Sequence, residues 1–194
     1  MSRLLRTIRL DKSDTVVFAQ AAEPGEWAVP GTFLFEGRQL DGLGRKEQIA
    51  FRSGFLGVTS FGWSTLAVVT EIQDRDREEA ALTLAHQLVQ RLGAPGLDAA
   101  LPAAEEEIAF AADLCRGHDD GTLIALHRRR DDTGALREQF RSLKPRRDTA
   151  FGAGYLQGHD KAFHFVETVD EDEQGIEPDM QIDLKAFGRP EGEP

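Results

Sequence analysis

The stretch from Phe51 to Ile72, FRSGFLGVTSFGWSTLAVVTEI, decides the fold that we predict for this chain. It contains no proline and combines aromatic with β-branched side chains, which fit a pleated, half-buried surface and therefore favour strands. Gly62, between Ser60 and Ser64, is expected to form the turn between two strands. From Trp63 to Ile72 the polar and apolar positions do not alternate cleanly, so we expect a central strand that is covered on both faces.

The glycines of this stretch leave two interpretations open. A glycine inside a strand marks a bulge, a bend, or a place where another backbone or a ligand comes close. The segment from Phe151 to Gly158 is also glycine-rich, but its G-x-G-x-x-x-G spacing misses the dinucleotide fingerprint by one residue, and a strand is expected after it where that fingerprint needs a helix. A bulged or flexible loop is the favoured interpretation there. The candidate ligand-binding residues are Trp63, Gly54, Gly57, Gly62 and Tyr155.

The N-terminal third is expected to add short strands and loops. Imperfect alternation and turn residues predict an edge strand, a second strand that pairs with it in a hairpin, a short strand, a surface loop, and a strand leading into the central stretch. In order, these are Arg3–Leu10, Thr15–Ala19, Thr32–Phe35, Gly37–Glu47 and a strand from Gln48.

Two consecutive helices follow Ile72. Apolar residues recur at helical spacing from Ala81 to Leu92, acidic residues occupy the preceding turns, and Gly93 begins the stop signal. In the second helix Pro102 is expected in the first turn, an apolar stripe includes Cys115, and Gly117 is expected to end it.

A charged hairpin and an acidic tail are expected after the helices. Taking Asp131–Gly134 as a four-residue loop pairs Arg130 with Ala135 and places His127 opposite Glu138, where the carboxylate would raise the pKa of the histidine. A last strand is predicted over Ala162–Val169. The predicted fold class is α+β, with a largely antiparallel sheet and the two helices on one face. We expect one domain over residues 1–169 and an extended or partly disordered acidic tail over 170–194.

Composition limits the function. The 194 residues carry a net charge of −11, which argues against a general nucleic-acid or anionic-membrane binder. The single cysteine rules out an internal disulfide framework. No segment approaches the length of a membrane span, and the first residues lack the apolar region of a signal peptide, so a cytoplasmic protein is expected.

A divalent metal site is one candidate. Cys115 and His118 have C-x2-H spacing, and His159 and His164 have H-x4-H spacing, which lies within the range of zinc pairs. The alternative for Cys115 is a small buried hydrophobe, since it falls on the apolar stripe. Acid–base chemistry has weaker support. Glu106 and Asp113 lie seven residues apart on one helix face, but paired carboxylates on an acidic helix are usually solvated surface, and no nucleophile motif is present.

The other candidate site is electrostatic. Eight basic residues lie between Arg128 and Arg147 against three acids, whereas the segment from Glu167 to Pro194 carries ten acids against two basic residues. This asymmetry predicts an interaction surface, and the alternative is an exposed sheet edge that is charged to resist aggregation. The candidate residues are Arg128, Arg129, Arg130, Arg137, Arg141, Arg146 and Arg147.

The runs EPGEWAVPG, GFLGVTSFGWSTL and LPAAEEEIAFAADLC together resemble an uncharacterised bacterial protein family. The resemblance covers most of the chain and implies no catalytic residue, because no activity is established for that family. The function expected from the sequence is a non-catalytic cytoplasmic accessory protein that binds a protein partner, a second copy of itself or a small ligand. The alternative is a metal-binding protein or metal-dependent enzyme.

Overall fold

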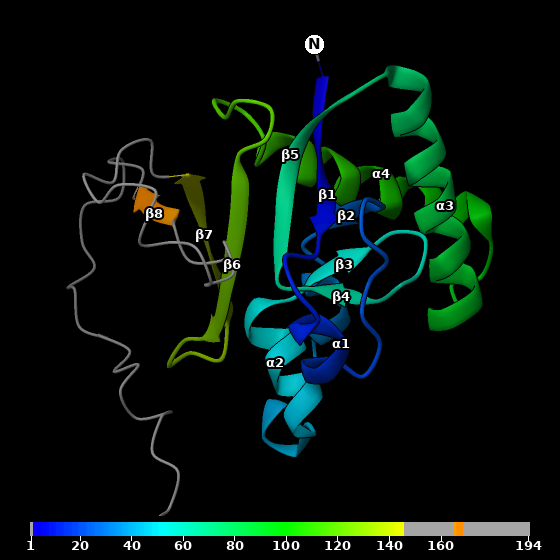
Figure 1. Ribbon diagram of the computed structural model, residues 1–194. Helices are drawn as coiled ribbons and strands as arrows, with labels where there is room; N and C mark the ends of the chain where they lie inside the picture. The colour runs from blue at the N-terminus through cyan, green and yellow to red at the C-terminus, as the bar shows by residue number, and fades with distance from the viewer. Residues whose placement is uncertain (1, 146–164, 169–194) are drawn as a thin grey trace, which may run out of the picture.

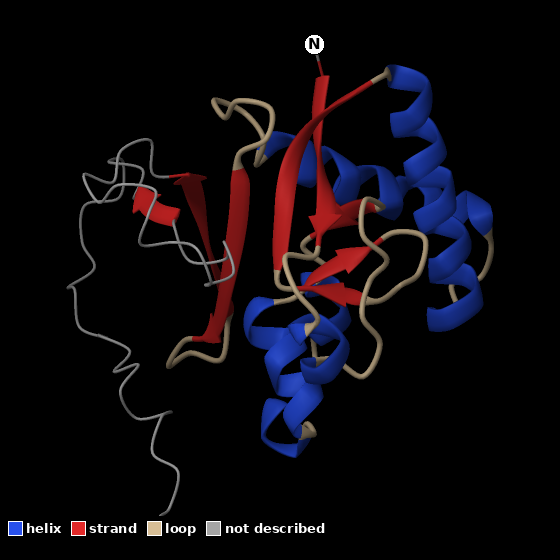
Figure 2. Ribbon diagram, viewed as in Figure 1, coloured by secondary structure: helices blue, strands red, loops and turns tan. Residues whose placement is uncertain are grey.

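The computed structural model describes residues 2–145 and 165–168, which form one antiparallel sheet with helices packed against it (Figures 1 and 2). The predicted α+β class is confirmed. The described part contains eight strands in the order β4-β3-β2-β1-β5-β6-β7-β8. The strands are β1 (Ser2–Ile8), β2 (Trp27–Val29), β3 (Phe55–Gly57), β4 (Trp63–Ser64), β5 (Leu66–Ile72), β6 (Leu123–Arg130), β7 (Leu136–Pro145) and β8 (Phe165–Thr168). The helices are α1 (Ser13–Val17), η1 (Thr32–Phe35), η2 (Leu40–Gly42), α2 (Arg45–Ser53), α3 (Asp74–Leu92) and α4 (Leu97–Asp113), where η denotes a 3-10 helix.

The expected central strand is β5, which lies between β1 and β6. Its inward residues Ala67 and Val69 are fully buried and join the main core with side chains of α3 and α4. Those two helices pack side by side, and α4 contacts β1 and β2 (Figure 2). The two helices predicted after Ile72 are therefore confirmed. Gly93 adopts the left-handed conformation and caps the end of α3.

The central stretch is more broken than its composition suggests. β3 and β4 pair as expected on either side of Gly62, but the predicted strand from Trp63 to Ile72 divides at Thr65. Asp14 explains the division, because its carboxylate accepts a 2.7 Å hydrogen bond from the Thr65 hydroxyl and a 3.3 Å bond from the Ser64 hydroxyl. Side-chain bonds of this kind compete with regular strand pairing.

The predicted N-terminal hairpin is wrong. β1 is an interior strand, since it pairs with both β2 and β5, and Leu4 and Leu5 are both fully buried. The segment predicted as a second strand at Thr15–Ala19 is replaced by α1, and Thr32–Phe35 forms the 3-10 helix η1.

The strand predicted from Gln48 is also wrong, because residues 45–53 form α2. The carboxylate of Glu47 accepts a hydrogen bond from the Gly44 N–H at 3.3 Å, which stabilises the start of this helix. Ala50 and Phe51 are buried in a second apolar cluster with Phe18 and Phe35. The predicted surface loop at 37–47 consequently contains η2 and the first turn of α2.

The second long helix begins earlier and ends sooner than predicted. α4 starts at Leu97, so Pro102 lies inside it and not in its first turn. It ends at Asp113, and Gly117 adopts the left-handed conformation only four residues later.

The β6–β7 hairpin has a register one residue away from the predicted one. The turn is five residues long, because the Asp131 N–H donates to the Ala135 carbonyl at 2.9 Å and the Asp131 carboxylate accepts a 3.0 Å bond from the Ala135 N–H. Arg128 therefore lies opposite Glu138, whereas His127 lies opposite Gln139. A slip of one residue exchanges the two faces of a strand, so the predicted pairing of His127 with Glu138 is wrong.

Part of the predicted last strand is confirmed as β8, which pairs with β7. Residues 170–194 lie outside the described residues.

Candidate functional site

A buried arginine organises the region where the sheet divides. β6 pairs with β7 along the whole length of β6, whereas β5 pairs with β6 only at Leu123–Ala125. The last five residues of β6 therefore extend beyond β5, and α2 packs against β6 in that place (Figure 1).

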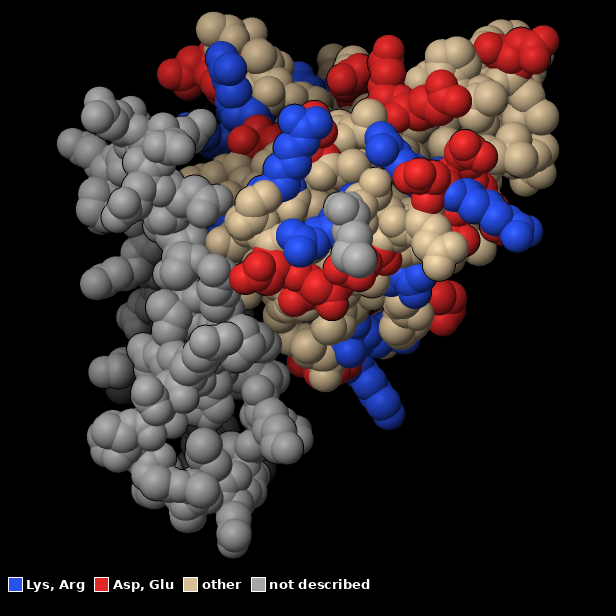
Figure 3. All heavy atoms as spheres, turned by 90° about the horizontal axis from the view of Figure 1, so that it is seen from above, with Lys and Arg blue, Asp and Glu red and all other residues tan. Residues whose placement is uncertain are grey.

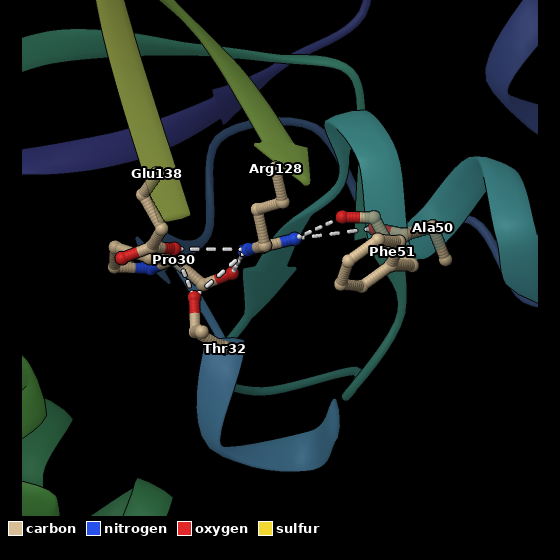
Figure 4. A network of polar contacts seen from close by, with 6 residues as sticks. All are labelled: Pro30, Thr32, Ala50, Phe51, Arg128 and Glu138. Atoms are coloured by element: carbon tan, nitrogen blue, oxygen red, sulfur yellow. Dashed lines mark hydrogen bonds and ion pairs between the residues drawn. The ribbon is translucent and has the colours of Figure 1, made fainter. Parts of the chain in front are cut away.

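Arg128 lies in this fork, and its side chain has no solvent exposure. Its Nε forms an ion pair with Glu138 at 2.9 Å and donates to the Thr32 hydroxyl at 2.8 Å (Figure 4). Nη1 donates to the carbonyls of Ala50 at 3.2 Å and Phe51 at 2.9 Å. A further bond runs from Nη2 to the Pro30 carbonyl, and Glu138 also accepts from the Thr32 hydroxyl.

These contacts give Arg128 a structural role. The carbonyls of Ala50 and Phe51 belong to the last turn of α2, where a cation is favourable. The Ala50 carbonyl also accepts a 2.9 Å bond from the Gly54 N–H, so Arg128 is its second donor. The Arg128 guanidinium therefore links α2 to β6. Its bonds to Pro30 and Thr32 also link these two elements to η1. A buried charge needs both a counter-ion and hydrogen bonds. Here each of the three guanidinium nitrogens of Arg128 donates at least one hydrogen bond, and Glu138 supplies the counter-ion.

Glu107 of α4 lies near the same network. Burial raises the pKa of Glu107 to about 7, and repulsion from Glu138 and Glu36 adds to the increase, while Arg128 opposes it. The described part of the molecule thus has a carboxyl group that titrates near neutral pH on the inner side of the hairpin.

A groove lies between α2, η2 and the end of β6. We call it the arginine groove. Its cavity volume is about 490 Å³. Apolar residues from η2 and α2 form part of its lining, and basic residues from α2 and β6 form the rest. The described residues that line it are Leu40, Leu43, Gln48, Phe51, Arg52, His127, Arg128, Arg129 and Arg130. None of them is acidic, although the whole chain carries a net charge of −11.

The pKa of His127 reflects the positive potential at this groove. Partial desolvation lowers the pKa of His127, and the nearby charges of Arg141, Arg129 and Arg52 lower it further. The predicted increase through Glu138 is therefore wrong, because the observed register places arginines around the histidine instead of a carboxylate.

The predicted interaction patch divides between two faces of the hairpin. Arg128 is buried, so its inclusion in a surface patch is wrong. Arg129 and Arg137 are exposed and lie opposite each other, and Arg137 pairs with Asp131 at 2.7 Å. Arg130 donates to the Arg38 carbonyl at 2.8 Å. Arg141 is exposed and contributes to the potential at His127. Arg146 and Arg147 lie outside the described residues.

The end of the molecule seen in Figure 3 has a different charge distribution. Acidic and basic side chains are interspersed over the described part of this face, and neither sign occupies it alone. The groove is distinguished by its lack of acidic residues.

The glycines of the central stretch are explained by close packing within the protein. A Cβ atom at Gly54, Gly57 or Gly62 would lie less than 3.0 Å from existing atoms, namely the Trp63 ring, the Glu26 carboxylate and the Ala21 carbonyl, respectively. Trp63 itself packs on Phe35 with ring centroids 5.4 Å apart. The structure thus gives these residues a scaffold role. Tyr155, the remaining predicted ligand-binding residue, lies outside the described residues.

The structure places only half of the predicted metal site. Cys115 is buried, its thiol donates to the Ala111 carbonyl at 3.3 Å, and burial raises the pKa of the thiol to about 12. His118 follows the end of α4, whereas His159 and His164 lie outside the described residues. Within the described ranges, no three His, Cys, Asp or Glu residues are grouped so as to hold a metal ion. A thiol held protonated by burial is a poor metal ligand, so the metal site stays a prediction from spacing alone.

Sequence reasoning missed Arg52 and the apolar residues of the groove. It placed Leu40 and Leu43 in a loop and Phe51 in a strand, so nothing brought them near the hairpin. The sequence does contain a signal for α2. Glu47 lies three residues after Gly44, and the apolar residues Ala50 and Phe51 follow Glu47 by three and four residues, which places them on one helix face.

Comparison with known proteins supplies a family but no activity. The model of a family of unknown function, DUF6505, matches residues 1–156. The chain belongs to this family. No curated protein and no solved structure matches it. The DUF6505 match spans β1 to β7 and therefore includes every residue that lines the arginine groove. Among the described helices, none is both long enough and apolar enough to cross a membrane.

Proposed function

We propose that this protein is a non-catalytic accessory protein of the cytoplasm that binds an acidic segment of a partner protein in the arginine groove. The observation that carries the proposal is the convergence of basic side chains on a groove without any acidic residue, in a chain of net charge −11. Complementary charge of this kind steers and orients an acidic partner.

The basic side chains of the groove are available for a partner. Arg52 and Arg129 are exposed, and neither forms an ion pair with another residue in the described part of the chain. Arg128 holds α2 against β6, so the two walls that carry Arg52 and Arg129 are fixed relative to each other. A preformed site loses less conformational freedom on binding.

The lining also supports binding over catalysis. Its only side chain suited to proton transfer is His127, and no serine, threonine, cysteine or carboxylate lies in the lining to act with it. Nucleophilic catalysis needs such a nucleophile beside its base. The cytoplasmic location is supported by the single cysteine, since cytosolic proteins rarely rely on disulfides.

Binding of a fluorescein-labelled polyglutamate peptide, followed by anisotropy, tests the proposal. We expect binding at about 0.01 M salt that weakens at about 0.15 M, because the Debye length falls from about 30 to about 8 Å. The Arg52→Gln/Arg129→Gln double variant should bind about fivefold more weakly, because two exposed ion pairs of about 0.5 kcal/mol each are lost. Arg75→Gln, an exposed position on α3, is the matched control. Equal affinity of both variants would contradict the proposal.

Small anions and a second copy of the chain are the other candidate ligands. Light scattering over a range of protein concentrations separates binding of a second copy of the chain from binding of a foreign acidic segment. A monomer that still binds the peptide supports the proposal, whereas a dimer that dissociates in the Arg52→Gln/Arg129→Gln variant would replace it with self-association.

A further inference from the structure

The floor of the arginine groove is apolar and held in place by the protein core. Phe51 from α2 is buried, and its ring contacts the Phe35 ring edge-on, with centroids 5.2 Å apart and planes at 74°. Leu43 is buried beside it in the same cluster, and Leu40 is half-buried. The cavity therefore offers a ligand apolar surface that exists before binding.

The rim of the groove is basic on two sides. Arg52 comes from the last turn of α2, and Arg129 comes from β6, the element on the other side. Arg130 is held at the hairpin end by its bond to the Arg38 carbonyl. Cations thus lie on both walls of a groove whose lining also contains apolar side chains, a combination that a simple anion does not match.

Resting on the proposed function, we propose that the groove recognises a segment in which a bulky apolar side chain lies between acidic residues. The apolar side chain would contact Leu40, Leu43 and Phe51, and the flanking carboxylates would pair with Arg52 and Arg129. A volume of about 490 Å³ accommodates such a side chain with its neighbouring backbone. Burial of the apolar side chain adds affinity that salt does not screen, whereas the rim pairs are screened.

Two labelled peptides of otherwise identical sequence test this inference. Each has glutamates on both sides of a central residue, which is leucine in one and glycine in the other. The leucine peptide should bind the full-length protein about tenfold more tightly, the effect expected for burial of part of a leucine side chain. Leu40→Ser should remove most of this difference. Leu82→Ser, at an exposed leucine of α3, should leave it unchanged.

The outcomes separate this inference from the proposed function. Equal binding of the two peptides, with strong salt dependence, would overturn the inference and leave a general anion-binding groove. Failure of both peptides to bind would overturn the proposed function as well. Inorganic phosphate, which can engage only the rim, should displace the glycine peptide at lower concentration than the leucine peptide. Displacement of both at one concentration would also overturn the inference.

Discussion

Arg128 and Arg129 are adjacent, carry the same side chain, and have opposite surroundings. Arg128 has no exposed side-chain surface and donates hydrogen bonds to Glu138, Thr32 and three backbone carbonyls. Arg129 is exposed and has no ion pair within the described residues. Because successive side chains of a strand point to opposite faces, one arginine serves the fold and the other is free to serve a partner.

The largest test of this comparison is stability. Arg128→Met should lower the free energy of unfolding by about 3–5 kcal/mol, since it removes the counter-ion of the partly buried Glu138 carboxylate and the donor to the Pro30 and Phe51 carbonyls. Arg129→Met should change it by no more than about 0.5 kcal/mol. Urea denaturation measures both.

A second substitution checks the cause. If the unpaired charge of Glu138 contributes to the loss, Arg128→Met/Glu138→Leu should recover part of the stability, while the carbonyls of Pro30 and Phe51 still lack the donor that Arg128 supplied. Similar losses in Arg128→Met and Arg129→Met would show that the two arginines do not differ in role.

The comparison of Arg128 with Arg129 also shows how much of the fold and of the site can be predicted from the sequence. Periodicity located α3 and α4, and composition located β5, because long amphipathic or apolar runs form their patterns locally. The hairpin was found, but its register depended on whether Ala135 belonged to the turn. That one residue decides whether Glu138 lies opposite His127 or Arg128, so the site could not be built correctly from the sequence.

The remaining errors arose where distant contacts override local preference. β-branched residues at Thr15 and Val16 favour a strand, yet Asp14 bonds to Thr65, fifty-one positions away, and α1 forms there. Arg52 joined the groove only through the packing of α2 on β6. Neither contact leaves a periodic signal, so a single sequence contains little information about them.

The region around Glu107, on the inner side of the hairpin, should also differ from the outer face, which carries His127, in how its ionisation responds to pH. The pKa of Glu107 is about 7 in the folded protein, above its usual value of 4.5. Between these values the folded state holds a proton that the unfolded chain releases, so raising the pH lowers the free energy of unfolding. We expect a loss of about 1–2 kcal/mol from pH 5 to 8, allowing for the partial exposure of Glu107.

Glu107→Gln should remove this contribution, because glutamine does not titrate, and should make the protein more stable than the unsubstituted chain at pH 8. Glu105→Gln is the matched control, since Glu105 is an exposed residue of α4 and is not among the charges that raise the pKa of Glu107. Urea denaturation across this pH range measures the effect. An unchanged pH dependence in Glu107→Gln would show that the carboxyl group does not titrate in this interval.

The smallest expected effect lies on the outer face, at His127. Because the charges of Arg141, Arg129 and Arg52 help to lower the pKa of His127, Arg129→Gln should raise it. NMR titration of the imidazole measures the shift, and added salt should reduce the difference between the two proteins by screening the same charges. Arg75→Gln should leave the titration unchanged. A His127 pKa that does not respond to Arg129→Gln would mean that Arg129 contributes little to the positive potential at this groove, which would contradict the role proposed for Arg129 in binding an acidic partner.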